Sequence, residues 1–149
     1  MANASILAAF ERMWQHIIIR FGNKKEDTTY AGCYYYETTN GVEWVNPPML
    51  VGVEYRTTER YNGKPVYVKV VDYGQLPNSK EGSNYGLSAN LNIISISGFA
   101  VGSSYNIPVP GYYAIQNIGY TRSSGNLWIS TTTDLSSYHC YVIAKYTKE

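Results

Sequence analysis

The sequence has few of the residues that carry most catalytic chemistry and most electrostatic binding. Its 149 residues include two cysteines, two histidines, three tryptophans and three phenylalanines. Only 15% of the residues are charged, and 12 Lys and Arg oppose 11 Asp and Glu for a net charge of +1. Because an excess of basic residues drives most binding to nucleic acids and anionic membranes, we expect neither a nucleic-acid partner nor membrane insertion.

The cysteines and histidines do not form a metal or nucleophile signature. Cys33 and Cys140 are too far apart for a C-x-x-C motif, and we expect both to be reduced thiols. His16 and His139 have no second ligand at metal-binding spacing. Adjacent residues of a strand face opposite sides of a sheet, so His139 cannot act on Cys140. We therefore predict no metal, no cofactor and no Cys–His nucleophile.

The sequence also lacks the local motifs of common enzyme classes. It has no G-x-S-x-G, no glycine-rich phosphate loop before a helix and no H-E-x-x-H. Glu54 and Glu59 stand among Arg56, Arg60 and Lys64, which favours surface ion pairs over catalytic carboxylates. We predict that the protein is not an enzyme. The carboxylates from which a glycosidase pair would have to come are Glu37, Glu43, Glu54, Glu59, Asp72 and Asp134.

The first 22 residues are typical of one amphipathic helix. An isolated helix of this length is marginal in water, so it packs either on the protein's own β-domain or against copies of itself. Bulky apolar residues at both core positions of a heptad repeat favour assemblies of more than two helices. No basic leader or small-residue cleavage site is present, so we expect no signal peptide and synthesis in the cytoplasm. The predicted oligomerisation seam, spaced alternately by three and four, is Leu7, Phe10, Trp14, Ile17 and Phe21.

The remaining residues, 23–149, are predicted to form one β-domain. They contain all 16 tyrosines, and Asn62-Gly63 between two alternating segments is a strong hairpin signal. We predict a mainly β fold, an antiparallel β-sandwich of jelly-roll or Greek-key type preceded by one N-terminal amphipathic α-helix. Residues 23–29 and 76–83 are expected to be polar connections, and Gly98 is expected to separate two strands. The expected strands cover residues 30–38, 42–45, 51–61, 64–73, 85–97, 105–109, 112–122, 127–133 and 138–146.

The tyrosine excess also has a functional interpretation. Aromatic rings stack on the apolar face of a pyranose while nearby polar groups bond its hydroxyls, so a Tyr-rich surface with Asn and Ser suits sugar binding. In alternating strands about half of these rings must instead face a core or an interface. The candidate ligand-surface aromatics are Trp44, Tyr112, Tyr113 and Trp128.

Residues 59–78 read E-R-Y-N-G-K-P-V-Y-V-K-V-V-D-Y-G-Q-L-P-N. This segment resembles the [DN]-G-K-P-[IV]-Y-x-[KR] … G-x-L-P-N phrase of short structural proteins and fibre tips of tailed bacteriophages and prophages. The C-terminal residues 126–148 are similar to the final hairpin of those proteins, which closes on an x-L-x-Y-T-K strand. Residues 30–36 and 42–48 have no counterpart in that pattern.

The resemblance implies a β-sandwich head in a homotrimeric virion fibre, with no catalytic residues. Its implied function is that of a bacteriophage virion structural protein, a tail-fibre or baseplate-associated head that attaches to the host surface. A capsid head-fibre or decoration protein and a freestanding carbohydrate-binding module are the alternatives. The expected partners are further copies of the chain, other virion proteins and a bacterial surface glycan or protein receptor, and the expected location is the virion.

Overall fold

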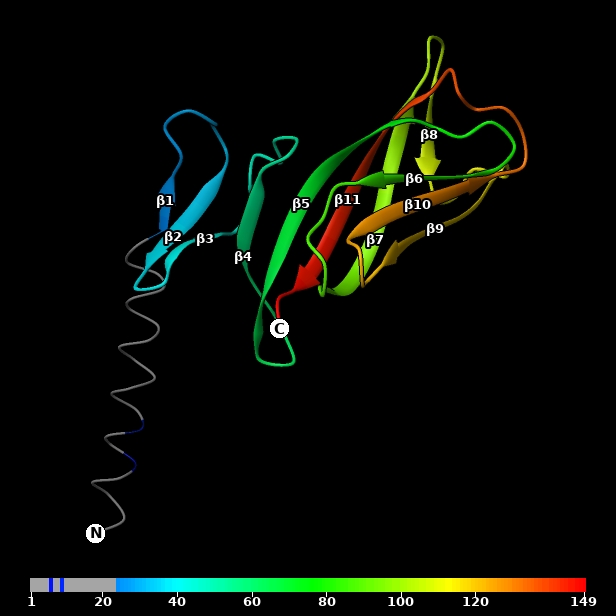
Figure 1. The fold of residues 1–149 in the computed structure, drawn as a ribbon. Coiled ribbons are helices and arrows are strands. Elements are labelled where there is room, and N and C mark those ends of the chain that lie inside the picture. The colour runs from blue at the N-terminus through cyan, green and yellow to red at the C-terminus, as the bar shows by residue number, and fades with distance from the viewer. Residues whose placement is uncertain (1–5, 7–8, 10–23) are drawn as a thin grey trace. The chain divides into compact units, whose positions relative to one another are not determined.

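The computed structural model describes residue 6, residue 9 and residues 24–149 (Figure 1). Apart from Ile6 and Ala9, the predicted helix lies outside the described residues, as does the whole predicted seam of Leu7, Phe10, Trp14, Ile17 and Phe21. The described chain is mainly β, which confirms the predicted fold class at that level. It divides into two compact units, Met1–Pro48 and Met49–Glu149, a division that the sequence did not predict.

The described part of unit 1 is a meander of three short antiparallel strands. Strands β1 (Lys24–Glu26), β2 (Tyr34–Thr38) and β3 (Gly41–Trp44) pair in that order. The prediction of a polar connection over residues 23–29 was wrong where β1 forms. Lys24 and Lys25 pair with tyrosines of β2, and the Lys24 ammonium lies 4.4 Å from the centre of the Tyr34 ring. The Lys24 side chain therefore covers a tyrosine ring, and Lys25 instead pairs with Glu37 at 2.7 Å.

Unit 2 contains two antiparallel sheets. The larger has the order β4-β5-β11-β7-β8, and the smaller has the order β6-β10-β9. The bounds of its strands are β4 (Glu54–Tyr61), β5 (Lys64–Gln75), β6 (Glu81–Tyr85), β7 (Asn92–Val101), β8 (Asn106–Val109), β9 (Ile115–Thr121), β10 (Asn126–Thr131) and β11 (His139–Thr147).

The core of unit 2 lies between these two sheets. Alternate residues of β11, Cys140 and Val142, are fully buried and contact Leu127 and Ile129 of β10 in one apolar cluster. Period-two alternation along each strand puts these side chains on the shared inner face. The other buried members of the cluster are Val71, Tyr73, Leu76, Ala100, Ile107, Val109, Ala114, Ile115 and Leu135.

The predicted hairpin at Asn62-Gly63 is confirmed. Tyr61 pairs with Lys64 across the turn, and both central residues have positive φ, 49° for Asn62 and 76° for Gly63. Asn and Gly tolerate this left-handed backbone, which is why the dipeptide fixes the register of β4 against β5.

Other expected boundaries were wrong. Residues 81–83, expected in the polar connection 76–83, belong to β6, which pairs with β10 along five positions from Glu81 to Tyr85. The expected strand over residues 85–97 is broken between β6 and β7, where Asn90 takes a φ of 60°. Gly98 lies inside β7, and a Cβ there would come within 2.2 Å of the Tyr141 carbonyl oxygen. Glycine at this position therefore permits close approach of the two strands.

Candidate functional site

The four predicted ligand aromatics have different surroundings. In unit 1, Trp44 is half-buried and packs on Tyr35 with ring centres 5.2 Å apart. In unit 2, Trp128 is half-buried over Gly119, where a Cβ would come within 2.4 Å of the indole. Both tryptophans are therefore engaged in packing within their own sheets. Tyr112 and Tyr113 instead lie together in the β8–β9 connection, with ring centres 4.5 Å apart.

The fold adds two more tyrosines to Tyr112 and Tyr113. The rings of Tyr105, before β8, and Tyr138, before β11, lie 5.8 Å apart, and the Tyr105 hydroxyl is hydrogen-bonded to both Tyr138 and Tyr112. We call Tyr105, Tyr112, Tyr113 and Tyr138 the tyrosine cluster. Tyr113 is 83% exposed and Tyr105 is 55% exposed, so the cluster offers ring faces and hydroxyls to solvent.

Local turns hold the tyrosine cluster in place. The Gly102 N–H donates to the Tyr105 carbonyl at 3.2 Å, and a Cβ on Gly102 would come within 2.5 Å of the Tyr138 ring. The hydroxyl bonds shift the titration of the cluster: those from Tyr138 and Tyr112 lower the pKa of Tyr105, whereas the bond to Tyr105 raises the pKa of Tyr138. The bond with Tyr113 raises the pKa of Tyr112. Linked hydroxyls beside exposed rings are suited to sugar binding.

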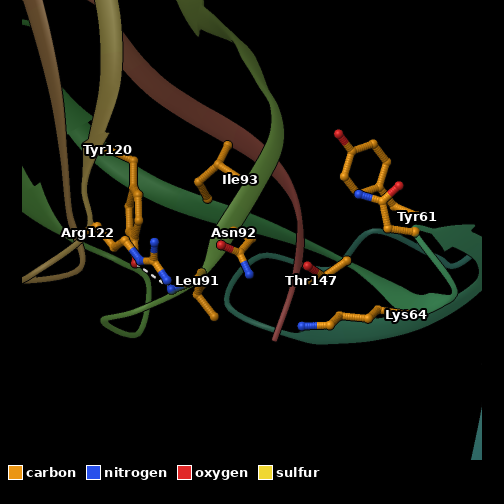
Figure 2. Close-up of a pocket in the computed structure, with 9 residues that line it drawn as sticks. Tyr61, Lys64, Leu91, Asn92, Ile93, Tyr120, Arg122 and Thr147 are labelled. Carbon is orange, nitrogen blue, oxygen red and sulfur yellow. Dashed lines mark hydrogen bonds between the residues drawn. The ribbon is translucent and has the colours of Figure 1, made fainter. Parts of the chain in front are cut away.

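A polar pocket lies at the other end of β11 from the tyrosine cluster (Figure 2). Its volume is about 550 Å³, within the roughly 300–1,000 Å³ typical of small-molecule sites. The β4–β5 hairpin, the start of β7 and the ends of β9 and β11 supply its walls. The residues that line it are Tyr61, Asn62, Lys64, Leu91, Asn92, Ile93, Tyr120, Arg122 and Thr147.

One side chain fixes the inner wall of the polar pocket. The Tyr120 hydroxyl accepts a hydrogen bond from the Leu91 N–H at 3.1 Å and donates one to the Ser88 carbonyl at 2.7 Å. Figure 2 shows Tyr120 and Leu91 side by side at this wall. At the mouth, the Arg122 guanidinium forms an exposed ion pair with the Glu149 carboxylate.

A second, apolar hollow of about 320 Å³ lies on the face of the larger sheet that points away from the core. Phe99 and Tyr141 form part of it, with ring centres 5.5 Å apart. Its other lining residues are Met49, Val51, Val70 and Ile143. Because its walls carry almost no polar groups, this hollow can pack against an apolar surface but has few hydrogen-bonding groups to orient a ligand.

The structure separates His139 from Cys140, as predicted. Cys140 is fully buried, and burial raises the pKa of its thiol to about 12. His139 lies on the opposite face, where its Nε2 is 2.7 Å from an Asp72 carboxylate oxygen. A bulge places Asp72 there: Gly74 has a φ of 85° and its N–H donates to Asp72 at 2.9 Å. This pair gave no local signal in the sequence because its members lie on different strands.

The expected ion pairs of Glu54 and Glu59 are present, with lysines that the sequence analysis did not single out. Glu59 pairs with Lys145 at 2.7 Å, and Glu54 pairs with Lys148. The Tyr146 hydroxyl also donates to Glu54, and burial together with this bond raises the pKa of Tyr146. These carboxylates therefore link β4 to the end of β11 and to Lys148, across the intervening β5 strand.

Within residues 24–149 and the two described residues before them, no group of three or more His, Cys, Asp and Glu is placed to hold a metal ion. The same residues include no helix long and apolar enough to cross a membrane. Comparisons of the chain with protein-family models, with curated proteins and with solved structures each gave no match.

Proposed function

We propose that the chain is a virion structural protein of a tailed bacteriophage, the head of a trimeric tail-fibre or baseplate appendage that attaches to the host surface. The observation that carries the proposal is the pairing of the two segments that resemble such proteins. Residues 59–78 supply β5 and residues 126–148 supply β11, and these strands pair from Tyr67 with Tyr146 to Gln75 with His139. The resemblance thus concerns neighbouring strands of one sheet, which supports a shared architecture.

The finer fold in this proposal is a β-sandwich of jelly-roll or Greek-key type. Two antiparallel sheets that share one apolar core support it. We also propose that residues 23–149 are the head and that three copies associate through the predicted seam of Leu7, Phe10, Trp14, Ile17 and Phe21, which lies outside the described residues. The exposed tyrosine cluster supports attachment to a glycan of the bacterial envelope, because such rings bind saccharides without any catalytic group.

Light scattering on the full chain tests the trimer. The expected mass is three times the 16.8 kDa of one chain. Changing Trp14 and Ile17 together to Asp places charges in the seam and should give monomers, whereas the matched control, Arg12→Asp with Gln15→Asp, changes other faces of the helix and should keep the trimer. A monomeric wild type would overturn the trimer and favour a freestanding carbohydrate-binding module.

Antibodies against the purified chain test the location. In negative-stain images of tailed particles from the bacterium that carries this sequence, labels on the tail or baseplate are expected. Labels on the capsid would favour the head-fibre or decoration alternative. Intact particles that bind no antibody would overturn a virion role.

A further inference from the structure

We propose that the polar pocket of Figure 2 binds an anionic saccharide, a sugar that carries a carboxylate or a phosphate, at a site separate from the tyrosine cluster. Tyr138 of the cluster directly precedes β11 and Thr147 of the pocket ends it. Nine residue steps of a strand span about 30 Å, so one small ligand cannot occupy both places. The inference rests on the proposed function only for the source of the saccharide, the bacterial envelope.

Two cations at the pocket supply the anion preference. Lys64 lines the pocket from the β4–β5 hairpin, and Arg122 lines it from the turn directly after β9. Among the described residues, no ion pair is formed by Lys64, whereas Arg122 already holds the carboxylate of Glu149. The Glu149 carboxylate is thus an example, within the chain, of the kind of anion that Arg122 binds. The pair is solvent-exposed and hence weak, so an external carboxylate or phosphate can displace it.

The remaining walls suit the body of a sugar. Tyr61 and Tyr120 supply aromatic rings, and Leu91 and Ile93 supply apolar surface for the C–H face of a pyranose. Because its hydroxyl is hydrogen-bonded to the backbone on both sides, Tyr120 is held in one orientation before a ligand arrives. The amides of Asn62 and Asn92, which also line the pocket, can donate to and accept from sugar hydroxyls.

The charge of the whole chain restricts the ligand further. A net charge of +1 does not favour a long polyanion spread over the surface, and only two cations line this pocket among the described residues. One anionic group on a sugar matches that arrangement. The apolar hollow around Phe99 offers no cation in its lining and does not compete for this ligand.

Isothermal titration of the full chain with defined probes tests the proposal. The probes are an aldobiuronic acid, which carries one carboxylate, maltose 1-phosphate, which carries one phosphate, and maltoheptaose as the neutral control. We expect one of the two anionic probes to bind at least tenfold more tightly than maltoheptaose, with an affinity that falls as salt increases. The probe that binds identifies which anion the pocket accepts.

Three variants connect that binding to the pocket. Lys64→Gln should weaken anionic binding about tenfold or more, because it removes the cation that has no ion pair. Glu149→Gln should strengthen it several-fold, because it removes the carboxylate that competes for Arg122. Lys80→Gln removes an equal charge from an exposed position outside the pocket lining and should change nothing. Unfolding midpoints close to that of the wild type establish that the variants are folded.

Equal affinity for maltoheptaose, an affinity unchanged by Lys64→Gln, or no binding of either anionic probe would overturn the anionic pocket. None of these results affects the trimer mass or the labelling of particles, so the proposed virion function is judged independently. Conversely, the wild-type chain could be monomeric and absent from particles and still bind an anionic probe that Lys64→Gln does not bind. That result would support the pocket and overturn the virion role.

Discussion

Different interactions stabilise the described parts of the two compact units of this chain. Unit 2, Met49–Glu149, buries a continuous apolar cluster between two sheets. In the described part of unit 1, residues 24–48, the only buried residue is Glu43, and Val42 and Val45 are exposed. A small sheet without a buried apolar face is marginal by itself. Tyrosine-rich segments of this chain thus occur both in a body stabilised by a buried core and in a small sheet, residues 24–48, without a buried apolar side chain.

Side-chain hydrogen bonds stabilise the turns of residues 24–48, whereas burial stabilises unit 2. An Asp27 carboxylate oxygen accepts the N–H groups of Thr29 and Tyr30 at 2.8 and 2.9 Å. The Asn46 side chain accepts the Tyr34 N–H at 2.9 Å and donates to the Gly32 carbonyl. Hydrogen bonds exposed to water contribute little net stability. We therefore expect the amides of residues 24–48 to exchange through local opening before the amides of β5 and β11 do.

The largest expected contrast is in thiol reactivity. Cys33 of unit 1 is half-exposed, whereas Cys140 is fully buried in unit 2 and its pKa is raised from 9.0 to about 12. That shift lowers the thiolate population of Cys140 at neutral pH about a thousandfold. In the native protein, timed alkylation followed by mass spectrometry should label Cys33 and leave Cys140 unmodified. In denaturant both should react, and equal native rates would contradict the assigned burial.

Core truncation should separate the units next. Leu127→Ala removes a fully buried side chain from the cluster in unit 2 and should cost about 2–5 kcal/mol of unfolding free energy. Val45→Ala, the matched control in unit 1, alters a side chain that is 46% exposed and should cost less than about 0.5 kcal/mol. Urea unfolding followed by tyrosine fluorescence measures both. Similar costs would mean that the two units share one core.

Backbone strain in a turn of each unit should also affect the two units differently. Gly63 in unit 2 and Gly41 in unit 1 have φ values of 76° and 97°. Valine at either position strains the turn by roughly 1–2 kcal/mol. Gly63→Val should lower the midpoint of the main unfolding transition, whereas Gly41→Val should only speed amide exchange in residues 24–48. Gly63→Asn, which tolerates this backbone, is the control and should retain most of the stability. Equal shifts of the main transition by both valine variants would show that the units unfold as one.

The features that the sequence predicted correctly are local ones. Asn62-Gly63 specifies its hairpin through backbone preferences alone, and period-two alternation reveals β11 because the core lies on one face of it. Strands β1 and β6 were missed because short polar segments become strands only through their partners, β2 and β10. Tertiary pairing decided these elements, as β-propensity is strongly context-dependent.

The candidate sites were predicted only in part for a related reason. Tyr112 and Tyr113 are adjacent in sequence and could be singled out, but Tyr105 and Tyr138 join them only when separate loops meet. The polar pocket gave no local signal, since Lys64 and Arg122 belong to segments far apart in the sequence. The Pro47-Pro48 break was visible in the sequence, although its meaning as a boundary between compact units was not.

The smallest expected effect concerns a turn aspartate in unit 2. An Asp134 carboxylate oxygen accepts the Ser136 hydroxyl at 2.6 Å and the Ser136 N–H at 2.9 Å, and these bonds hold the pKa of Asp134 below its usual value. A carboxyl pKa that is lower in the folded state contributes stability above the unfolded pKa, and this contribution is lost as pH falls through the folded pKa. Ser136→Ala removes the hydroxyl donor, so the pKa of Asp134 should rise toward that of a free aspartate. The variant should therefore lose less unfolding free energy than the wild type as the pH falls. Carboxyl NMR titration measures this shift, with Ser137→Ala as the matched control. The hydroxyl is the first cause of the lowered pKa, so an Asp134 titration that is unchanged in Ser136→Ala would contradict the assigned bond.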